Sequence, residues 1–194
     1  MIDVRVLTGQ PLEAVLDDVA ALRISVFRAF PYLYDGDLEY ERQYLESYRQ
    51  SDKAILVGAF DGTRLIGAAT GAPLADHADE FGDAFQGTGL PPEKIFYCAE
   101  SVLLQNYRGR GIGHQFFNHR EAHARGLGFS HVAFCAVIRP DDHPAKPFSY
   151  RALDGFWRGR GYAPLDGIKA QFPWRDVGDV IETEKPMQFW MRAL

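Results

Sequence analysis

The stretch from Ile95 to Phe117 constrains the fold of this chain more than any other. It reads IFYCAESVLLQNYRGRGIGHQFF, an apolar run followed by a glycine-rich turn and the start of a segment with helical spacing. The run from Ile95 to Leu104 is apolar except for Glu100 and Ser101, which predicts one central strand covered on both faces. A helix is expected from His114 to Arg125. The sequence therefore predicts a strand, a tight turn and a helix in an α/β protein.

Three glycines stand at alternate positions of the turn, at Gly109, Gly111 and Gly113. Glycine allows a positive φ and the close approach of a ligand, while the free N–H groups and the dipole of a following helix favour an anion. Arg108 and Arg110 would add positive charge. The turn is predicted to hold a phosphate group, although a glycine-rich turn with a purely structural role fits the same pattern.

Two common classes of phosphate-binding turn fit this stretch poorly. A P-loop has Lys-Ser or Lys-Thr after its last glycine, where this chain has His114 and Gln115. A dinucleotide fingerprint has G-x-G-x-x-G and an acidic residue at the end of the next strand. Here the turn is G-x-G-x-G, and the strand expected from Ser130 to Ile138 is followed by no acid before Asp141.

A third class fits well. Arg108, Gly111 and Gly113 carry the pattern Gln/Arg-x-x-Gly-x-Gly/Ala, and Tyr-Arg-Gly leads into it. This stretch resembles the acetyl-CoA pyrophosphate loop of the GNAT superfamily of N-acetyltransferases. The resemblance implies acetyl-CoA as cosubstrate, with its pantetheine arm along Val102 and Leu103. It also implies that the pyrophosphate is held by Arg108, Gly109, Arg110, Gly111, Ile112, Gly113 and His114.

The resemblance also implies the fold, an α/β GNAT acyl-CoA N-acyltransferase fold. Such a fold has a mixed, mostly antiparallel central sheet of about seven strands with helices on both faces, and two central strands splay apart around the cofactor. A single domain over residues 1–194 is expected, because 194 residues that are 46% hydrophobic can bury a full core. The expected strands are Val4–Leu7, Ala54–Phe60, Arg64–Gly71, Ile95–Leu104, Ser130–Ile138, Ile168–Trp174 and Lys185–Arg192. The other expected helices are Pro11–Arg28, Leu38–Gln50 and Ser149–Arg160.

Glu100 is the candidate general base. An amine attacks a thioester only when it is neutral, so a base that removes its proton assists the reaction. Glu100 stands eight residues before Arg108, a position that often carries the catalytic acid in the resembling family. A buried carboxylate is costly unless it is hydrogen-bonded, paired or facing a wet cleft. A structural pairing of Glu100 with an arginine such as Arg139 is the alternative.

The general acid is less clear from the sequence. The family usually has a tyrosine where this chain has Trp157, and an indole N–H cannot act as a general acid. Tyr150 is the candidate substitute, two turns earlier on the same face of the expected helix and about 10 Å away along its axis. Solvent could also protonate the departing thiolate. The missing tyrosine keeps open a second reading, a catalytically silent acyl-CoA-binding or sensor protein.

Four residues are candidates for the acceptor site. Tyr32 and Tyr34 lie in the turn between the first two helices, which borders the acceptor in the resembling family; simple packing under that turn fits equally well. Asp141 and His143 follow a central strand, where ligands of open α/β sheets bind, although they are also ordinary loop residues. The expected acceptor is a small-molecule or peptide amine of open identity.

The segment between Pro73 and Lys94 is the least regular part of the chain. It is acidic, with a short helix expected over Asp76 to Asp83, and it either caps the acceptor site or forms a solvated loop. Cys98 and Cys135 are expected to be free buried thiols.

Composition limits the partners. A net charge of −5 without a basic tract argues against nucleic acid. No apolar run approaches the roughly 20 residues that cross a bilayer, so we expect no membrane association and a cytoplasmic location. The resemblance allows a homodimer.

No metal is expected. His119 and His123 are one helical turn apart, but Glu121 falls one position too late for the zinc-protease pattern. A metal-dependent enzyme using His119, His123 or His143 is the third reading, and it predicts inhibition by chelators.

Overall fold

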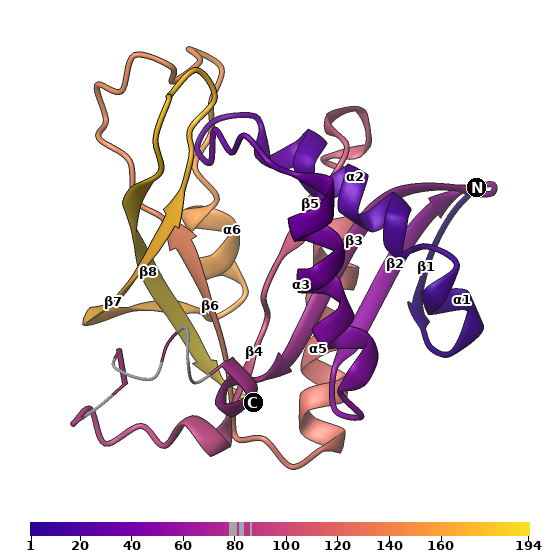
Figure 1. The fold of residues 1–194 in the computed structure, drawn as a ribbon. Coiled ribbons are helices and arrows are strands. Elements are labelled where there is room, and N and C mark those ends of the chain that lie inside the picture. Colours follow the sequence, from indigo (N-terminus) through magenta and orange to yellow (C-terminus); the bar gives the residue numbers. More distant parts are fainter. Residues whose placement is uncertain (78–80, 82–83, 86) are drawn as a thin grey trace.

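The computed structural model describes residues 1–77, 81, 84–85 and 87–194 (Figure 1). Within these residues, eight strands form one sheet in the order β1-β2-β3-β4-β6-β8-β7, with β5 paired to β3. The pairing of β4 with β6 is parallel, and the other described pairings are antiparallel. The mixed, mostly antiparallel sheet is therefore confirmed. The strands are β1 Ile2–Leu7, β2 Ile55–Asp61, β3 Arg64–Pro73, β4 Ile95–Tyr97, β5 Ser101–Leu103, β6 His131–Val137, β7 Ala163–Trp174 and β8 Thr183–Ala193.

Helices cover both faces of the sheet, as expected (Figure 1). They are α1 Gln10–Glu13, α2 Leu16–Phe27, α3 Leu38–Gln50, α5 Ile112–Gly126 and α6 Asp154–Gly159, with short 3₁₀ turns at Leu74–His77, Pro92–Lys94 and Gln105–Tyr107. The Asp37 side chain caps α3 by accepting a hydrogen bond from the Tyr40 N–H at 3.0 Å. Gly62, at φ 62°, closes the hairpin between β2 and β3 at the predicted Asp-Gly turn.

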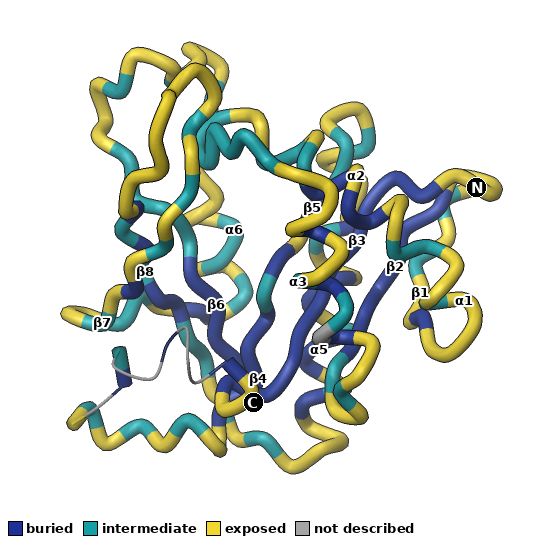
Figure 2. Tube along the Cα trace, viewed as in Figure 1, coloured by how far each residue is buried: buried dark blue, intermediate teal, exposed yellow. Residues whose placement is uncertain are grey.

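Three apolar clusters hold the layers together. On one face, Phe116 and Phe117 of α5 pack against the sheet together with α6. On the opposite face, α2 and α3 cover β2 and β3 through residues such as Val19 and Leu45. The third cluster lies on the C-terminal half of the sheet around Phe189. Figure 2 shows the result, with buried central strands between exposed helix surfaces and exposed outer loops.

The predicted strand from Ile95 to Leu104 is interrupted at residues 98–100. The Cys98 N–H donates to the Ala133 carbonyl of β6 at 2.8 Å, whereas the next N–H, that of Ala99, donates to the Thr70 carbonyl of β3 at 3.2 Å. The backbone thus changes partner within one residue. Beyond this point β5 pairs with β3 and β6 pairs with β8, so the two halves of the sheet separate as the resemblance implied.

Two predicted helices are wrong in extent. The helix expected from Pro11 to Arg28 is divided into α1 and α2, because Val15 has φ −113° and interrupts the helical backbone. The helix expected over residues 149–160 begins only at Asp154, since the preceding residues form turns such as the one in which the Tyr150 N–H donates to the Pro147 carbonyl. β7 also begins earlier than expected, with an irregular pairing near Gly167, which has φ 78°.

The acidic segment after β3 contributes to the core. Leu74, Phe81 and Phe85 are buried and pack with residues of β4, β6 and β8. A solvated loop is therefore the wrong description of these residues. Asp76 and His77 lie in the 3₁₀ turn, while Asp79, Glu80 and Asp83 of the predicted helix lie outside the described residues. In the described ranges, no helix has the length and apolarity needed to cross a bilayer.

Candidate active site

The glycine-rich turn has the geometry of an anion site. Gly109 and Gly111 have φ 75° and 80°, in the left-handed region that favours glycine, and α5 starts directly after them. Within the described chain, none of the six N–H groups from Gly109 to His114 donates to a protein acceptor. A Cβ atom added at Gly109 or Gly111 would meet nothing within 4 Å. Unengaged donors beside open space fit a pyrophosphate.

Two arginine side chains lie on this turn. Arg108 Nε donates to the Leu103 carbonyl at 3.3 Å, and an Arg110 amino group donates to the Asn106 carbonyl at 3.0 Å. Both side chains are exposed, so they add positive charge without occupying the N–H groups. A surface depression alongside is lined by Asp61, Arg64, Leu104, Gln105, Asn106, Tyr107 and Arg110.

The start of α5 packs against α6. The His114 ring lies 4.8 Å from the Phe156 ring, and its Nδ1 is 3.1 Å from an Arg160 amino group. A Cβ at Gly113 would lie 3.4 Å from Phe156, an ordinary contact distance. His114 and Gly113 are thus placed by α6 as well as by their own helix.

Strand β5 leads from the strand interruption to this turn. Its residues Val102 and Leu103 pair with Ala68 and Gly67 of β3 along one edge. Along its other edge, β5 pairs with no strand in the described part of the chain. An extended chain can add to such an edge like another strand, which fits a pantetheine arm.

Glu100 lies in the interruption itself and is buried, with only 6% of its surface exposed. Its Oε2 is 2.7 Å from an Arg23 amino group and accepts a hydrogen bond from the Tyr44 hydroxyl at 3.1 Å. Its Oε1 accepts no hydrogen bond from any described residue. Glu100 therefore does pair with an arginine, as the alternative expected, but that arginine is Arg23; Arg139, the example named, binds Asp176 instead.

Arg23 joins Glu100 to a larger buried group. Its Nε binds the carboxylate of Glu41, a residue that is fully buried. Burial disfavours the charged form of Arg23, but Glu100, Tyr44 and Glu41 outweigh that effect and raise its pKa well above the usual range. We call the residues so connected the Arg23 cluster: Arg23, Tyr34, Glu41, Tyr44, Tyr48 and Glu100.

The tyrosines of the Arg23 cluster stay protonated. Burial, followed by the nearby Glu100 carboxylate, raises the pKa of both Tyr44 and Tyr48. Their hydroxyls are 2.9 Å apart, so they form one hydrogen-bonded pair beside Glu100. Burial, followed by the nearby Glu41 carboxylate, also raises the pKa of Tyr34.

Arg120 of α5 supports the interruption from the other face of the sheet. Only 1% of its surface is exposed, and one amino group donates to the carbonyls of Glu100 at 2.8 Å and Thr70 at 3.1 Å. The other amino group donates to the Ser101 hydroxyl at 2.7 Å. A buried cation thus satisfies the carbonyl groups of the interruption and fixes the backbone that carries Glu100.

Replacing Arg120 with methionine is expected to destabilise the protein by about 2 to 4 kcal/mol, because the buried Thr70 and Glu100 carbonyls each lose one of their two donors and the Ser101 hydroxyl loses a charged partner. Urea unfolding followed by fluorescence measures this. The control is Arg125→Met, on the exposed last turn of the same helix, which should cost less than about 1 kcal/mol. Equal unfolding midpoints for the two variants would contradict the role given to Arg120.

Tyr32 and Tyr34, the two tyrosines predicted at the acceptor site, are half-buried. The Tyr32 carbonyl accepts hydrogen bonds from Arg139 at 2.7 Å and from the Trp174 indole at 3.0 Å. Burial raises the pKa of Tyr32. Tyr34 belongs to the Arg23 cluster. The structure therefore brings Tyr34 into the network of Glu100 and ties Tyr32 to the C-terminal strands.

Tyr150 and His143 meet at a single ring. The Phe30 ring lies 4.7 Å from Tyr150 and 5.6 Å from His143. Tyr150 precedes α6, so its predicted place on the same helix face as Trp157 is wrong. Burial and then Asp154 raise its pKa, which makes the phenol a weaker acid.

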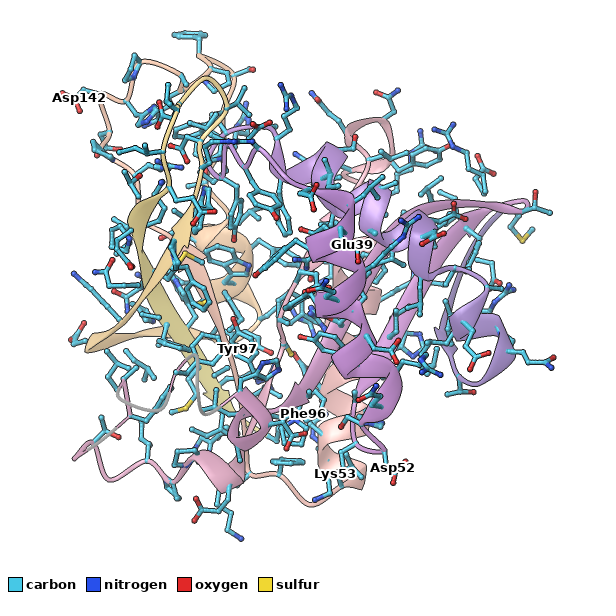
Figure 3. All side chains as sticks on the ribbon, in the orientation of Figure 1. Glu39, Asp52, Lys53, Phe96, Tyr97 and Asp142 are labelled. Carbon is cyan, nitrogen blue, oxygen red and sulfur yellow. The ribbon has the colours of Figure 1, made fainter. Side chains whose placement is uncertain are left out.

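Asp141 and Trp157 lie apart from that ring. The Asp141 side chain is fully exposed and pairs with Lys146 at 3.1 Å, and Figure 3 shows its neighbour Asp142 at the outer edge of the loop. Trp157 packs between Phe134, at 5.0 Å, and Trp190, at 5.1 Å. Among the described residues, the Asp141 carboxylate therefore pairs with Lys146 and with none of the other predicted site residues.

The loop between α2 and α3 is fastened to the hairpin of β7 and β8 (Figure 1). Asp176 binds Arg139 at 2.7 Å and lies 3.5 Å from the Lys185 amino group. Burial opposes the charged form of Asp176, but these cations outweigh it and lower its pKa. The Val177 N–H also donates to the Leu33 carbonyl. The acceptor-side loop is thus held by residues far away in the sequence.

The sequence interpretation did not identify Arg23 or Arg120 as site residues. One signal was present for Arg23, since it falls on the apolar stripe that Val19, Leu22 and Val26 form along α2. A charged residue on such a stripe needs a buried partner. Arg120 gives a comparable signal, since it lies four residues after Phe116 and four before Ala124 on the buried stripe of α5.

The histidines predicted as alternative metal ligands have other surroundings. His123 Nε2 is 2.9 Å from the Lys53 carbonyl. In the part of the chain that the structure describes, no group of three or more His, Cys, Asp or Glu side chains could hold a metal ion. Cys98 is a free, buried thiol, and Cys135 is buried with its Sγ 3.0 Å from the Tyr97 hydroxyl.

Comparison with known proteins identifies the family. No protein of curated function matches the chain. Among solved structures, it is similar to a ribosomal-protein-alanine N-acetyltransferase from Brucella melitensis, with 17% identity, 99% of both chains covered and a TM-score of 0.62. It is also similar to yncA, a putative acetyltransferase from Salmonella typhimurium solved with acetyl-CoA, with 12% identity, 100% and 94% coverage and a TM-score of 0.61. A sequence model described as the acetyltransferase (GNAT) family matches residues 19–156. The chain therefore belongs to the GNAT family of acetyltransferases.

Proposed function

We propose that this protein is an N-acetyltransferase that moves an acetyl group from acetyl-CoA to a primary amine of a small molecule or peptide within a ternary complex. One observation carries the proposal: β5 connects the unpartnered Oε1 of Glu100 to the unengaged N–H groups of residues 109–114 along a free strand edge. Membership of the GNAT family supports it, and so does the acetyl-CoA in the structure of yncA.

Two parts of the chain would bind acetyl-CoA. The N–H groups from Gly109 to His114 would bind the pyrophosphate, with Arg108 and Arg110 adding charge. The free edge of β5, at Val102 and Leu103, would align the pantetheine arm. Acetyl-CoA supplies the acetyl group as a thioester.

Glu100 would take the proton from the acceptor ammonium. Its Oε2 is held by Arg23 and Tyr44, which leaves Oε1 to remove the proton directly or through a water molecule. Tyr150 stays the proposed proton donor to the thiolate, with solvent as its alternative. Tyr32, Tyr34 and His143 stay proposed acceptor contacts, as does Asp141, although it is exposed.

A catalytically silent acyl-CoA-binding or sensor protein is the second candidate. The observation that favours it is Trp157, which packs into the core where the family usually has its tyrosine. An indole N–H cannot supply a proton to a leaving group. The cytoplasmic location, a homodimer and the lack of nucleic-acid partners stay predictions from the sequence.

The first experiment is an assay of CoA release from acetyl-CoA, run against small amines, amino acids, polyamines and peptides, with calorimetric CoA binding beside it. We expect CoA binding, and turnover with one acceptor class. Binding without turnover in any class would favour the silent protein. A protein that does not bind CoA would contradict both candidates.

A further inference from the structure

Two buried carboxylates share one guanidinium in the Arg23 cluster. Arg23 binds Glu41 of α3 through its Nε, and it binds Glu100 through an amino group at 2.7 Å. The exposed fractions of the Glu41 and Glu100 side chains are 0% and 3%, so water screens neither of them effectively. The protonation of one carboxylate must therefore depend on the charge of the other.

The groups that face Glu100 come from several elements. They are Arg23 of α2, Tyr44 and Tyr48 of α3, and Arg120 of α5, with Tyr34 and Glu41 one contact further away. The guanidinium of Arg120 donates to carbonyl oxygens and to the Ser101 hydroxyl, and it binds no carboxylate of a described residue. The tyrosines are neutral. Among the described residues, Arg23 is thus the cation that forms an ion pair with the Glu100 carboxylate, and Glu41 shares that cation.

A carboxylate that has a guanidinium to itself is a weak base, because the opposite charge favours its ionised form. A base works best when its proton affinity is matched to the pH of the reaction. The second carboxylate, that of Glu41, offsets the positive charge of the guanidinium. The charges of Arg23 and Glu41 therefore sum to zero beside Glu100. This arrangement allows Glu100 to be held firmly by Arg23 without losing its ability to accept a proton.

We infer that Glu41 is a positioning residue for the proposed reaction. By sharing the guanidinium of Arg23, Glu41 leaves Glu100 able to accept a proton. The inference rests on the proposed function for its purpose. Its physical content is a coupling between two side chains, and that coupling can be measured without any acceptor.

Two substitutions should move the protonation of Glu100 in opposite directions. Glu41→Gln leaves Arg23 facing Glu100 alone, so Glu100 should take up its proton at a pH about one unit lower. Arg23→Gln leaves Glu41 as the nearest charge, so the midpoint should rise by about one unit or more.

The experiment is a ¹³C NMR titration of the glutamate carboxyl groups in the full-length protein, without CoA, over roughly pH 3 to 9. The Glu100 signal is assigned by its absence from the spectrum of Glu100→Gln. Glu39→Gln is the matched control. This substitution removes the same charge as Glu41→Gln, but Glu39 is exposed on the same helix (Figure 3). It should leave the Glu100 midpoint within about 0.2 units.

The expected order of midpoints is Glu41→Gln below the wild type, and Arg23→Gln above it. A midpoint in Glu41→Gln equal to or above that of the wild type overturns the inference. So does an Arg23→Gln midpoint that fails to rise, and either variant decides alone if the other does not fold. Since no acceptor is present, this failure is distinct from an absence of turnover in the acceptor assay.

Once an acceptor is known, kinetics give a second readout. The acidic limb of the kcat/KM profile should move with the NMR midpoint in each variant, and Glu41→Gln should lower kcat several-fold with little change in the KM for acetyl-CoA. A Glu41→Gln variant with altered KM for acetyl-CoA and an unmoved profile would show that Glu41 acts only on structure.

Discussion

Replacing Gly113 with aspartate is expected to weaken the affinity for CoA about 100-fold or more, in a protein that remains folded. Gly113 is in the first turn of α5, where the unengaged N–H groups lie. A carboxylate there would occupy those donors and repel a pyrophosphate. The new Cβ would be 3.4 Å from Phe156, so the backbone can accept it.

The Gly113→Asp substitution should not lower the stability of the protein. A loss of binding without a loss of stability separates an effect on the binding site from an effect on the fold. An acidic residue in the first turn of a helix stabilises it by about 0.3 to 1 kcal/mol. We therefore expect unchanged or slightly raised thermal stability together with lost binding, as measured by a thermal melt and by calorimetry.

Gly113→Ala is the matched control, since it adds the Cβ without the charge. It should bind CoA within about tenfold of the wild type, because the GNAT pattern accepts alanine at this position. Gly111→Asp should also lose binding, but its φ of 80° adds about 1 to 2 kcal/mol of strain for any side chain. Wild-type affinity in Gly113→Asp would refute the assignment of the turn to the cofactor.

Glu100→Gln is expected to lower the acetylation rate about 100-fold near neutral pH, and less as the pH rises toward the pKa of the acceptor amine. Glutamine can still accept hydrogen bonds from Arg23 and Tyr44, so the fold should be kept. What it lacks is the ability to take a proton. The rate is measured by CoA release with the acceptor class found in the assay, from about pH 6 to 10.

The pH dependence separates a base from a structural residue. At high pH the amine is already neutral and needs no base, so the ratio of wild-type to variant rates should fall toward one. A ratio that stays constant over the whole pH range would exclude Glu100 as the base. Unaltered CoA binding in the variant is the control for the cofactor site.

The sequence predicts this site well where the relevant interactions are local. Glycines at 109 and 111 need no distant partner to adopt a positive φ, and the apolar run, turn and helix follow one another directly. The hairpin at Asp61-Gly62 is predicted for the same reason. Each of these features depends on residues only a few positions apart.

Prediction fails where the partner is distant in the sequence. The strand through Glu100 is interrupted because its N–H groups switch from β6 to β3, a competition between two strands that no local pattern records. Arg23 contacts Glu100 and Glu41 only because α2 packs against α3 and β5. For Tyr150, helical spacing over residues 149–160 outweighed the turn signal at Pro147 in the prediction, and the turn prevails in the structure.

The fastening of the acceptor-side loop has a consequence for the order of folding. Tyr32 receives its hydrogen bonds from residues 107 and 142 positions later in the chain, at Arg139 and Trp174. Closing loops of this length is slow and entropically costly. During synthesis, α2 and the first three strands can pack before these partners exist. The loop between α2 and α3, which we propose to border the acceptor, therefore completes these contacts only after Arg139 and Trp174 are synthesised, later than the turn that we propose to bind CoA.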